Sequence, residues 1–171
     1  MNDSFILRDR IWREQNERVT LSSNATFASK SLGRYLDEEP DAFRTCFERD
    51  RDRIIHSKTF RRLKHKTQVF INPDGDHFIT RMTHTLNVTQ IGRSIAKTLG
   101  LNPDLTEAIC LGHDVGHSPF GHTGEDVLNE MLDGGWSHSE NSVRMLSIIE
   151  PLNLTKETIN GIEKHPWRYE E

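Results

Sequence analysis

Apolar positions recur at helical spacing along most of the chain beyond residue 40. The clearest series, with members three or four residues apart, consists of Val88, Ile91, Ile95 and Leu99. This period predicts an amphipathic helix that buries these side chains, and Gly100 is typical of a helix end. Residues 41–66 are expected to form another helical region, with these side chains available for burial: Phe47, Ile54, Ile55, Phe60 and Leu63.

Polar residues mark where several other helices begin. Asn102 can cap a helix with its side chain, and Pro103 suits the first helical position because its missing N–H has no partner to lose there. Ser137 and Glu140 have the spacing of a capping box, which predicts a helix start. A last helix is expected over residues 155–165. One more, starting near Thr123, is predicted to bury Val127, Leu128 and Met131.

Two segments interrupt the helical pattern. Residues 22–31 are small and polar, and we expect a loop or arm there. Between residues 68 and 80, two β-prone runs flank the turn-favouring residues 72–76, which predicts a short hairpin. The predicted fold class is therefore all-α, with one small β-hairpin near residues 68–80. We expect a partly irregular N-terminal arm over residues 1–40 and a helical domain over residues 41–171.

Composition narrows the classes of function. The 171 residues suit one domain or part of a larger one, and a net charge of −4 gives no general reason to expect nucleic acid or an anionic membrane as partner. No apolar stretch is long enough to span a bilayer. Cys46 and Cys110 are too few and too far apart for a disulfide framework, so we expect a cytoplasmic protein.

Histidine is concentrated in one part of the chain. Five of the nine histidines fall between His84 and His138, and three of these lie in the segment from His113 to Glu125. The adjacent imidazole and carboxylate of His113 and Asp114 offer two ligands to a divalent cation. His84, at the start of the preceding predicted helix, can supply a third if the two helices pack side by side. Three protein ligands leave positions for water and phosphate oxygens, as a catalytic metal site requires.

A structural role is the alternative for any one of these residues. A single histidine on an apolar helix face is more often a core residue than a ligand, and Glu125 alone can be a helix-start anion. The dense run of histidines and acids, interrupted by glycines, would make a poor core and a strained helix. The functional interpretation therefore fits the whole segment better. Cys110, just before the His113–Asp114 pair, is assigned to the core.

Several strings in the chain resemble the HD superfamily of metal-dependent phosphohydrolases. His84 together with the His113–Asp114 pair matches the superfamily pattern. The strings FRRLKHKTQVF, RMTHTL, LGHDVGHSPFGHTGE and WSHSENS are similar to its deoxynucleoside-triphosphate triphosphohydrolase (dGTPase-like) branch, within residues 46–165. The predicted domain over residues 41–171 is thus identified as the front part of an HD domain.

The resemblance implies a reaction and a metal site. The family cleaves a deoxynucleoside triphosphate (dNTP) at the α-phosphorus, giving deoxynucleoside and inorganic triphosphate. Its first three metal ligands match His84, His113 and Asp114. The implied cofactor is a divalent metal ion, with magnesium, manganese or cobalt expected first and iron, nickel or zinc as alternatives.

The same motifs imply the remaining site residues. The family's histidine–carboxylate catalytic pair matches His122 and Glu125, whose spacing lets the carboxylate orient the imidazole. Gln68 is implied to contact the sugar and Arg81 to grip phosphate. The implied neighbours of the triphosphate are His117 and His138. No role is assigned to four other histidines: His56, His65, His77 and His165.

The basic run from Arg49 to Lys66 has two interpretations. It is either a solvated helix face, partly offset by Asp50 and Asp52, or a phosphate-binding surface for an activating nucleotide or single-stranded DNA. The expected partners are therefore a dNTP substrate and, on the second interpretation, such an effector. For the full-length protein we also expect a homo-oligomer, and we expect no membrane association.

The fourth metal ligand of the family is an aspartate far beyond the HD pair. The later candidates in this chain are Asp126 and Asp133, both in a different context. We therefore expect a C-terminally truncated member with impaired activity. Two functions stay open: a dNTP triphosphohydrolase, and a non-catalytic HD module that binds nucleotide or supports oligomerisation with an incomplete metal site.

Overall fold

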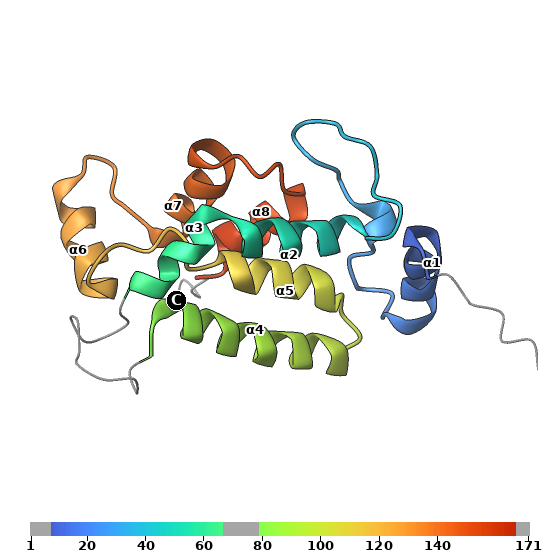
Figure 1. Cartoon of the computed structure of the whole chain (residues 1–171). Coiled ribbons are helices and arrows are strands. Elements are labelled where there is room, and N and C mark those ends of the chain that lie inside the picture. The colour runs from blue at the N-terminus through green and yellow to red at the C-terminus, as the bar shows by residue number, and fades with distance from the viewer. Residues whose placement is uncertain (1–7, 67–78, 167–171) are drawn as a thin grey trace, which may run out of the picture.

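The computed structural model describes residues 8–66 and 79–166. They form these helices (Figure 1): α1 (Arg10–Thr20), α2 (Cys46–His56), α3 (Lys58–Arg61), α4 (Arg81–Thr98), α5 (Pro103–Gly112), α6 (Gly121–Met131), α7 (His138–Arg144) and α8 (Lys156–Lys164). Short 3-10 turns lie at Ala28–Lys30 and Arg62–His65, and a π-helical turn at Met145–Ile149 continues α7. No β-strand occurs among the described residues, and the all-α prediction is confirmed.

Side-chain caps begin the helices near the histidine cluster. Asn102 Oδ1 accepts hydrogen bonds from two backbone N–H groups at the start of α5. Ser137 and Thr155 each cap a helix through the hydroxyl oxygen, at α7 and α8 respectively. Gly100 follows α4 with a φ of +68°, a conformation that glycine adopts without strain. These boundaries agree with the sequence predictions.

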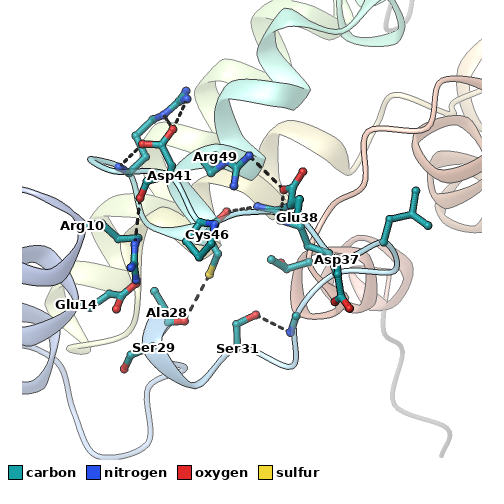
Figure 2. A pocket seen from close by; sticks show the side chains of 16 residues that line it. Arg10, Glu14, Ala28, Ser29, Ser31, Asp37, Glu38, Asp41, Cys46 and Arg49 are labelled. Carbon is teal, nitrogen blue, oxygen red and sulfur yellow. Dashed lines mark hydrogen bonds and ion pairs between the residues drawn. The ribbon is translucent and has the colours of Figure 1, made fainter.

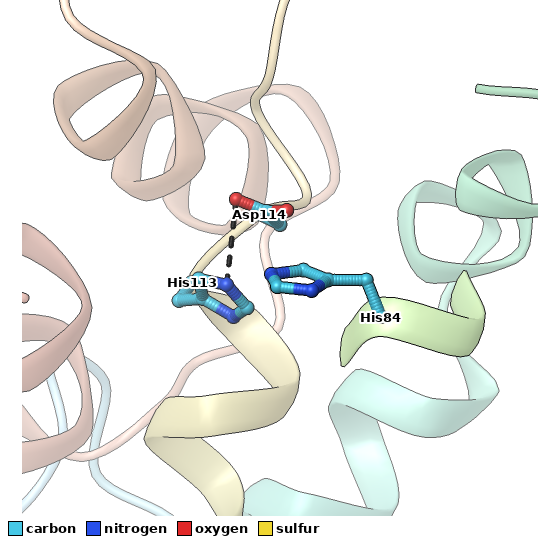
Figure 3. A group of neighbouring side chains, drawn as sticks. All are labelled: His84, His113 and Asp114. Atoms are coloured by element: carbon cyan, nitrogen blue, oxygen red, sulfur yellow. Dashed lines mark ion pairs between the residues drawn. The ribbon is translucent and has the colours of Figure 1, made fainter. Parts of the chain in front are cut away.

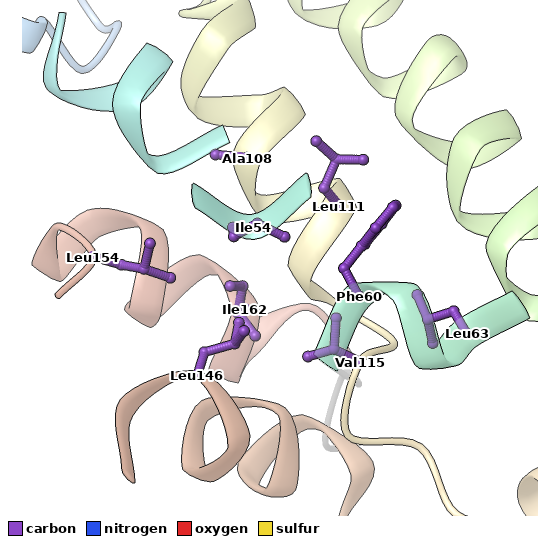
Figure 4. Packing of buried hydrophobic residues seen from close by; sticks show 9 residues of the cluster. All are labelled: Ile54, Phe60, Leu63, Ala108, Leu111, Val115, Leu146, Leu154 and Ile162. Carbon is purple, nitrogen blue, oxygen red and sulfur yellow. The ribbon is translucent and has the colours of Figure 1, made fainter. Parts of the chain in front are cut away.

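The core lies where α2, α5 and α8 meet (Figure 4). Its buried apolar residues are Ile54, Phe60, Leu63, Ala108, Leu111, Val115, Leu146, Leu154 and Ile162. Helix α5 packs against α2, α4 and α8. Gly112 lets α8 approach closely, because a Cβ at that position would lie 2.4 Å from Ile162 Cδ1. The end of α5, which precedes the histidine–aspartate pair, is thus held on several sides.

Helix α4 forms where it was predicted but buries a different face. Its buried residues are Arg81, Thr85, Thr89 and Ala96. Ile91, Ile95 and Leu99, which were predicted to be buried, are 61%, 53% and 60% exposed. A Cβ on Gly92 would lie 2.9 Å from Cys110 Sγ, so small residues bring α4 close to α5. The large apolar side chains lie outside that close contact.

Helix α6 also differs from the prediction. It begins at Gly121 rather than near Thr123, directly after Phe120 in a left-handed conformation with φ of +65°. Val127 and Met131, which were predicted to be buried, are 49% and 74% exposed. The physical reason is that α6 stands apart from the main helical body at one end of the domain (Figure 1).

The predicted N-terminal arm contains more helix than its sequence suggested. Within residues 1–40, α1 starts at an Asp9 cap and buries none of its own residues. The loop after α1 is fastened to the core by Arg34, which forms an ion pair with the buried Asp50 of α2. The arm therefore packs onto the helical domain through polar contacts.

The predicted hairpin near residues 68–80 is not borne out. Residues 67–78 lie outside the described residues, and the two described positions, Ile79 and Thr80, belong to no strand. Thr80 instead caps α4, with its Oγ1 accepting from the backbone N–H of Thr83. In the part of the chain that is described, no helix has both the length and the hydropathy needed to cross a membrane.

Candidate active site

Three side chains from two helices converge at the end of α5 (Figure 3). His113 and Asp114 directly follow α5, and His84 lies in the first turn of the neighbouring α4. One ligand atom of each residue lies within 4.8 Å of the other two. Two imidazoles and a carboxylate are a donor set that suits a divalent cation. We call His84, His113 and Asp114 the metal-ligand group.

Hydrogen bonds orient His113 toward this group. Its Nδ1 lies 2.7 Å from the carbonyl oxygen of Cys110, so Nδ1–H donates there and Nε2 is the nitrogen that faces the group. Nε2 is 3.4 Å from Asp114 Oδ1. A partner that holds the far ring nitrogen is typical of histidine ligands. Ser142 donates to the His113 carbonyl and accepts from the Gly116 N–H, which ties α7 to the loop after α5.

Asp114 is buried against Arg81. The guanidinium Nη1 donates to Asp114 Oδ2 at 2.8 Å, and both side chains are 5% exposed. Burial raises the pKa of Asp114, but the charges of His113 and Arg81 and this hydrogen bond outweigh burial and hold the pKa below its ordinary value. The carboxylate is therefore ionised at neutral pH. Arg81 Nε is buried with no hydrogen-bond partner among the described residues.

His117 is buried next to the metal-ligand group. It is 2% exposed, yet neither ring nitrogen has a hydrogen-bond partner within the described part of the chain. Burial lowers the pKa of His117 to about 4, so the imidazole is neutral at pH 7. A buried polar group left unpaired costs about 1–3 kcal/mol. The unpaired nitrogens therefore indicate a position where a ligand is expected.

Glu125 joins two histidines near the start of α6. Its carboxylate accepts from His122 Nδ1 at 3.2 Å and from His138 Nδ1 at 2.8 Å. Burial raises the pKa of Glu125, but the hydrogen bonds and charge of His138, with the bond from His122, outweigh burial and lower it. The His122 side chain is 78% exposed, whereas His138 is buried and stacks on His117 with ring centroids 4.7 Å apart. His122 is therefore the member of this set that water can reach.

Comparison with protein families matches residues 81–170 to the HD domain. The chain belongs to the HD-domain family. The matched residues begin at α4 and include the metal-ligand group, His117, and the His122–Glu125 pair. The family is one of metal-dependent phosphohydrolases.

Curated relatives carry a more specific name. The chain is 58% identical over 156 residues to a "deoxyguanosinetriphosphate triphosphohydrolase-like protein" of Caldanaerobacter subterraneus subsp. tengcongensis, covering 89% of this chain and 46% of the relative. It is 54% identical over 167 residues to a protein of the same name from Clostridium tetani, covering 95% and 47% respectively. The chain thus spans about half the length of the curated relatives it matches.

His165 lies in the HD-domain site although no role was assigned to it from the sequence. It follows the last turn of α8, and its Nε2 is 2.9 Å from His138 Nε2. Its ring meets that of His113 edge-on, with centroids 5.2 Å apart. The only sequence signal was its position at the end of a predicted helix, which does not indicate what that end faces.

Lys66, which the sequence marked only as the end of the basic run, contacts the loop after α5. Its Nζ donates to the backbone carbonyls of Val115 and His117, so it holds the loop that follows the metal ligands. Burial, followed by the charges of Arg62 and Arg81, lowers the pKa of Lys66 to about 8. A pocket of about 270 Å³ opens beside it, with lining residues that include Arg62, Lys66, His117, Pro119, Trp136 and Asn141.

Three residues named from the sequence are not placed in this HD-domain site. Gln68 lies outside the described residues. Asp126 and Asp133, the candidates for a further metal ligand, are both exposed. Neither belongs to any possible metal-binding group among the described residues.

Arginines at the start of the basic run form ion pairs within the fold. Arg49 and Arg53 both pair with Glu38, at 3.3 and 2.7 Å, and Arg51 pairs with Asp52 at 2.9 Å. The neighbouring pocket, of about 290 Å³, is lined by further paired charges (Figure 2). For residues 49–53 these contacts favour the interpretation of a solvated helix face partly offset by acidic side chains over that of a phosphate-binding surface.

Proposed function

We propose that the chain forms the metal- and phosphate-binding part of a dNTP triphosphohydrolase, which cleaves substrates such as dGTP to deoxynucleoside and inorganic triphosphate. The observation that carries this proposal is the buried His117, which has no hydrogen-bond partner among the described residues and lies between the metal-ligand group and the His122–Glu125 pair. A neutral imidazole there can donate N–H to a phosphate oxygen. The names of the curated relatives support dGTP as the substrate class.

The metal-ligand group fits a divalent cation by its chemistry. His113 presents Nε2 because Nδ1–H is already bonded to a carbonyl, and the Asp114 carboxylate is ionised. His84 adds a second imidazole from the adjacent helix. When bound, a divalent ion polarises a phosphoryl group and lowers the pKa of a coordinated water.

Cations beside this group can bind the negative charge of a triphosphate. Arg81 reaches Asp114 with Nη1 and keeps a buried Nε without a partner among the described residues, so its fork can donate a hydrogen bond to a further anionic oxygen. Arg62 and Lys66 line the adjoining pocket. Positioned charges supply much of the catalysis in phosphoryl transfer, because charge builds on the phosphate oxygens.

We assign proton transfer to His122, with Glu125 as its hydrogen-bond partner. Glu125 accepts from His122 Nδ1–H, which leaves Nε2 on an exposed side chain to take a proton from water or to return one to the leaving 5′ oxygen. The carboxylate fixes the tautomer and orientation of the ring. His138 shares the same carboxylate and stays buried.

The test is a single-turnover assay with the chain in excess over dGTP and with Mg²⁺, Mn²⁺ or Co²⁺ present. We expect metal-dependent release of deoxyguanosine and inorganic triphosphate. His122→Ala should lower the rate by about 10²–10⁴-fold with metal binding intact. His56→Ala, which changes an exposed histidine at the end of α2, should have no effect.

Other products or rates would contradict the proposal. Release of pyrophosphate with dGMP, or an unchanged rate in His122→Ala, would show that the assigned chemistry is wrong. Binding of Mn²⁺ and dGTP without any cleavage would favour the non-catalytic HD module, which the absence of a fourth ligand from the described residues also allows.

A further inference from the structure

His165 occupies a place in the site that the proposed chemistry does not use. It is half-buried at the end of α8, which packs against α5 and α7. Its ring touches two others: the edge of His113, at 5.2 Å between centroids, and His138, at 4.9 Å. The His165 ring thus lies between His113 of the metal-ligand group and the buried His138, which is hydrogen-bonded to Glu125.

The hydrogen bonds of His165 show which of its nitrogens carries the hydrogen. Nδ1 lies 2.7 Å from the carbonyl oxygen of Ile162, which can only accept, so Nδ1–H is the donor. The Nε2 of the neutral ring then offers a lone pair. This lone pair faces His138 Nε2 at 2.9 Å, and a hydrogen bond at that distance requires His138 Nε2–H to donate.

His138 is therefore held at both nitrogens. On its other side Nδ1 lies 2.8 and 3.0 Å from the two carboxylate oxygens of Glu125, which can only accept. Hydrogen bonds at both nitrogens fix the position and the rotation of the ring. Neither nitrogen is left to coordinate a metal ion, while the ring face stacks on His117 at an interplanar angle of 14°.

We propose that His165 is a positioning residue that fixes the His138 imidazole against Glu125, so that His138 meets phosphate groups in one fixed orientation beside His117. A ring held by two hydrogen bonds needs no reorientation when a ligand binds. The role for phosphate rests on the proposed function. The hydrogen-bonded series Glu125–His138–His165 is independent of catalysis and can be tested without it.

Two substitutions separate positioning from packing. His165→Ala removes the acceptor, whereas His165→Gln can place a side-chain oxygen near the position of Nε2. Calorimetric titration with inorganic triphosphate, in the presence of Mn²⁺, should show about 10–100-fold weaker binding for His165→Ala, the usual cost of losing an outer partner. His165→Gln should recover most of that loss, and the exposed His56→Ala should bind like the unaltered chain.

Side-chain ¹⁵N–¹H spectra of the unaltered chain provide a readout that needs neither binding nor turnover. We expect His165 as the Nδ1–H tautomer and His138 with hydrogens on both nitrogens, and His165→Ala should remove the hydrogen-bonded signal of His138 Nε2. A spectrum of the unaltered chain in which His138 lacks that hydrogen overturns the proposal, even if neither variant folds.

The binding data can overturn the proposal in three further ways. Equal affinity in all variants would show that His165 does not position the site. Equal losses in His165→Ala and His165→Gln would assign it a packing role. Tighter binding by His165→Ala would show that it competes with the ligand. If the spectra agree but dGTP is not cleaved, only the proposed function fails.

Discussion

Replacing Asp50 by alanine tests how the N-terminal arm and α8 are fastened to the core. The carboxylate of Asp50 is fully buried in α2. It accepts hydrogen bonds from Arg34 Nη1, from the backbone N–H and hydroxyl of Thr155, and from the Thr158 hydroxyl. Asp50→Ala removes this shared acceptor and leaves all of these donors without it.

The contacts of Arg34 determine the expected magnitude. Its side chain is 7% exposed, so the substitution leaves a buried charge that has lost its nearest carboxylate. Glu38 and the carbonyls of Cys46 and Asn153 still bind the guanidinium, which limits the loss. Removing one member of a buried ion pair costs about 3–5 kcal/mol. We expect a loss of about 3 kcal/mol or more, a large share of the ~5–15 kcal/mol typical of a domain.

Urea unfolding followed by far-ultraviolet circular dichroism measures this loss. Asp52→Ala is the matched control, because Asp52 lies two residues further along α2 and its partners Arg44 and Arg51 are partly exposed. The control should cost only about 0.2–1 kcal/mol. If Asp50→Ala lowers the free energy of unfolding no more than Asp52→Ala does, at an unchanged slope, the assigned fastening is wrong.

Two further predictions concern the site. His113→Ala should weaken Mn²⁺ binding at least about 10-fold because it removes a ligand of the metal-ligand group; calorimetric titration against His56→Ala checks this, and equal affinities would contradict it. Acidification should lower the free energy of unfolding, since burial lowers the pKa of His84, His117 and His165 from the ordinary value of 6.5. Below pH 6.5 these three histidines bind protons more readily in the unfolded chain than in the folded chain, so the free energy of unfolding falls. For His117 the difference in proton binding extends down to about pH 4. Urea titrations above and within this window measure the loss, and a flat profile would contradict the burial of these rings.

Helix boundaries were predictable from the sequence because their physics is local. Asn102, Ser137 and Thr155 cap backbone N–H groups only a few residues away, so the capping residue and the groups it caps are neighbours in the sequence. One exception is α6, which begins at Gly121 rather than near Thr123. Another is α1, whose polar sequence was expected to be partly irregular. It starts at the Asp9 cap and buries none of its own residues, so a hydrophobic pattern did not indicate it.

The buried face of a helix was not predictable in the same way. The apolar period through Ile91 and Ile95 correctly indicated a helix, but which side is covered depends on the neighbouring element. In α4 the small residues Thr85, Thr89 and Gly92 allow a close approach to α5, and this closeness decided the packing. Among the described residues no helix packs closely on α6, and Val127 stays 49% exposed.

By itself the sequence determined the helical class, most helix ends and the convergence expected of His84 with the His113–Asp114 pair, because each rests on a short motif or a regular period. Tertiary structure alone decided that α8 returns to the end of α5 and brings His165 against His138, and that Lys66 binds the loop after the metal ligands. The physical reason is distance along the chain. A hydrogen bond between residues far apart in sequence depends on how whole helices pack, and helix packing is set by the shapes of many side chains at once.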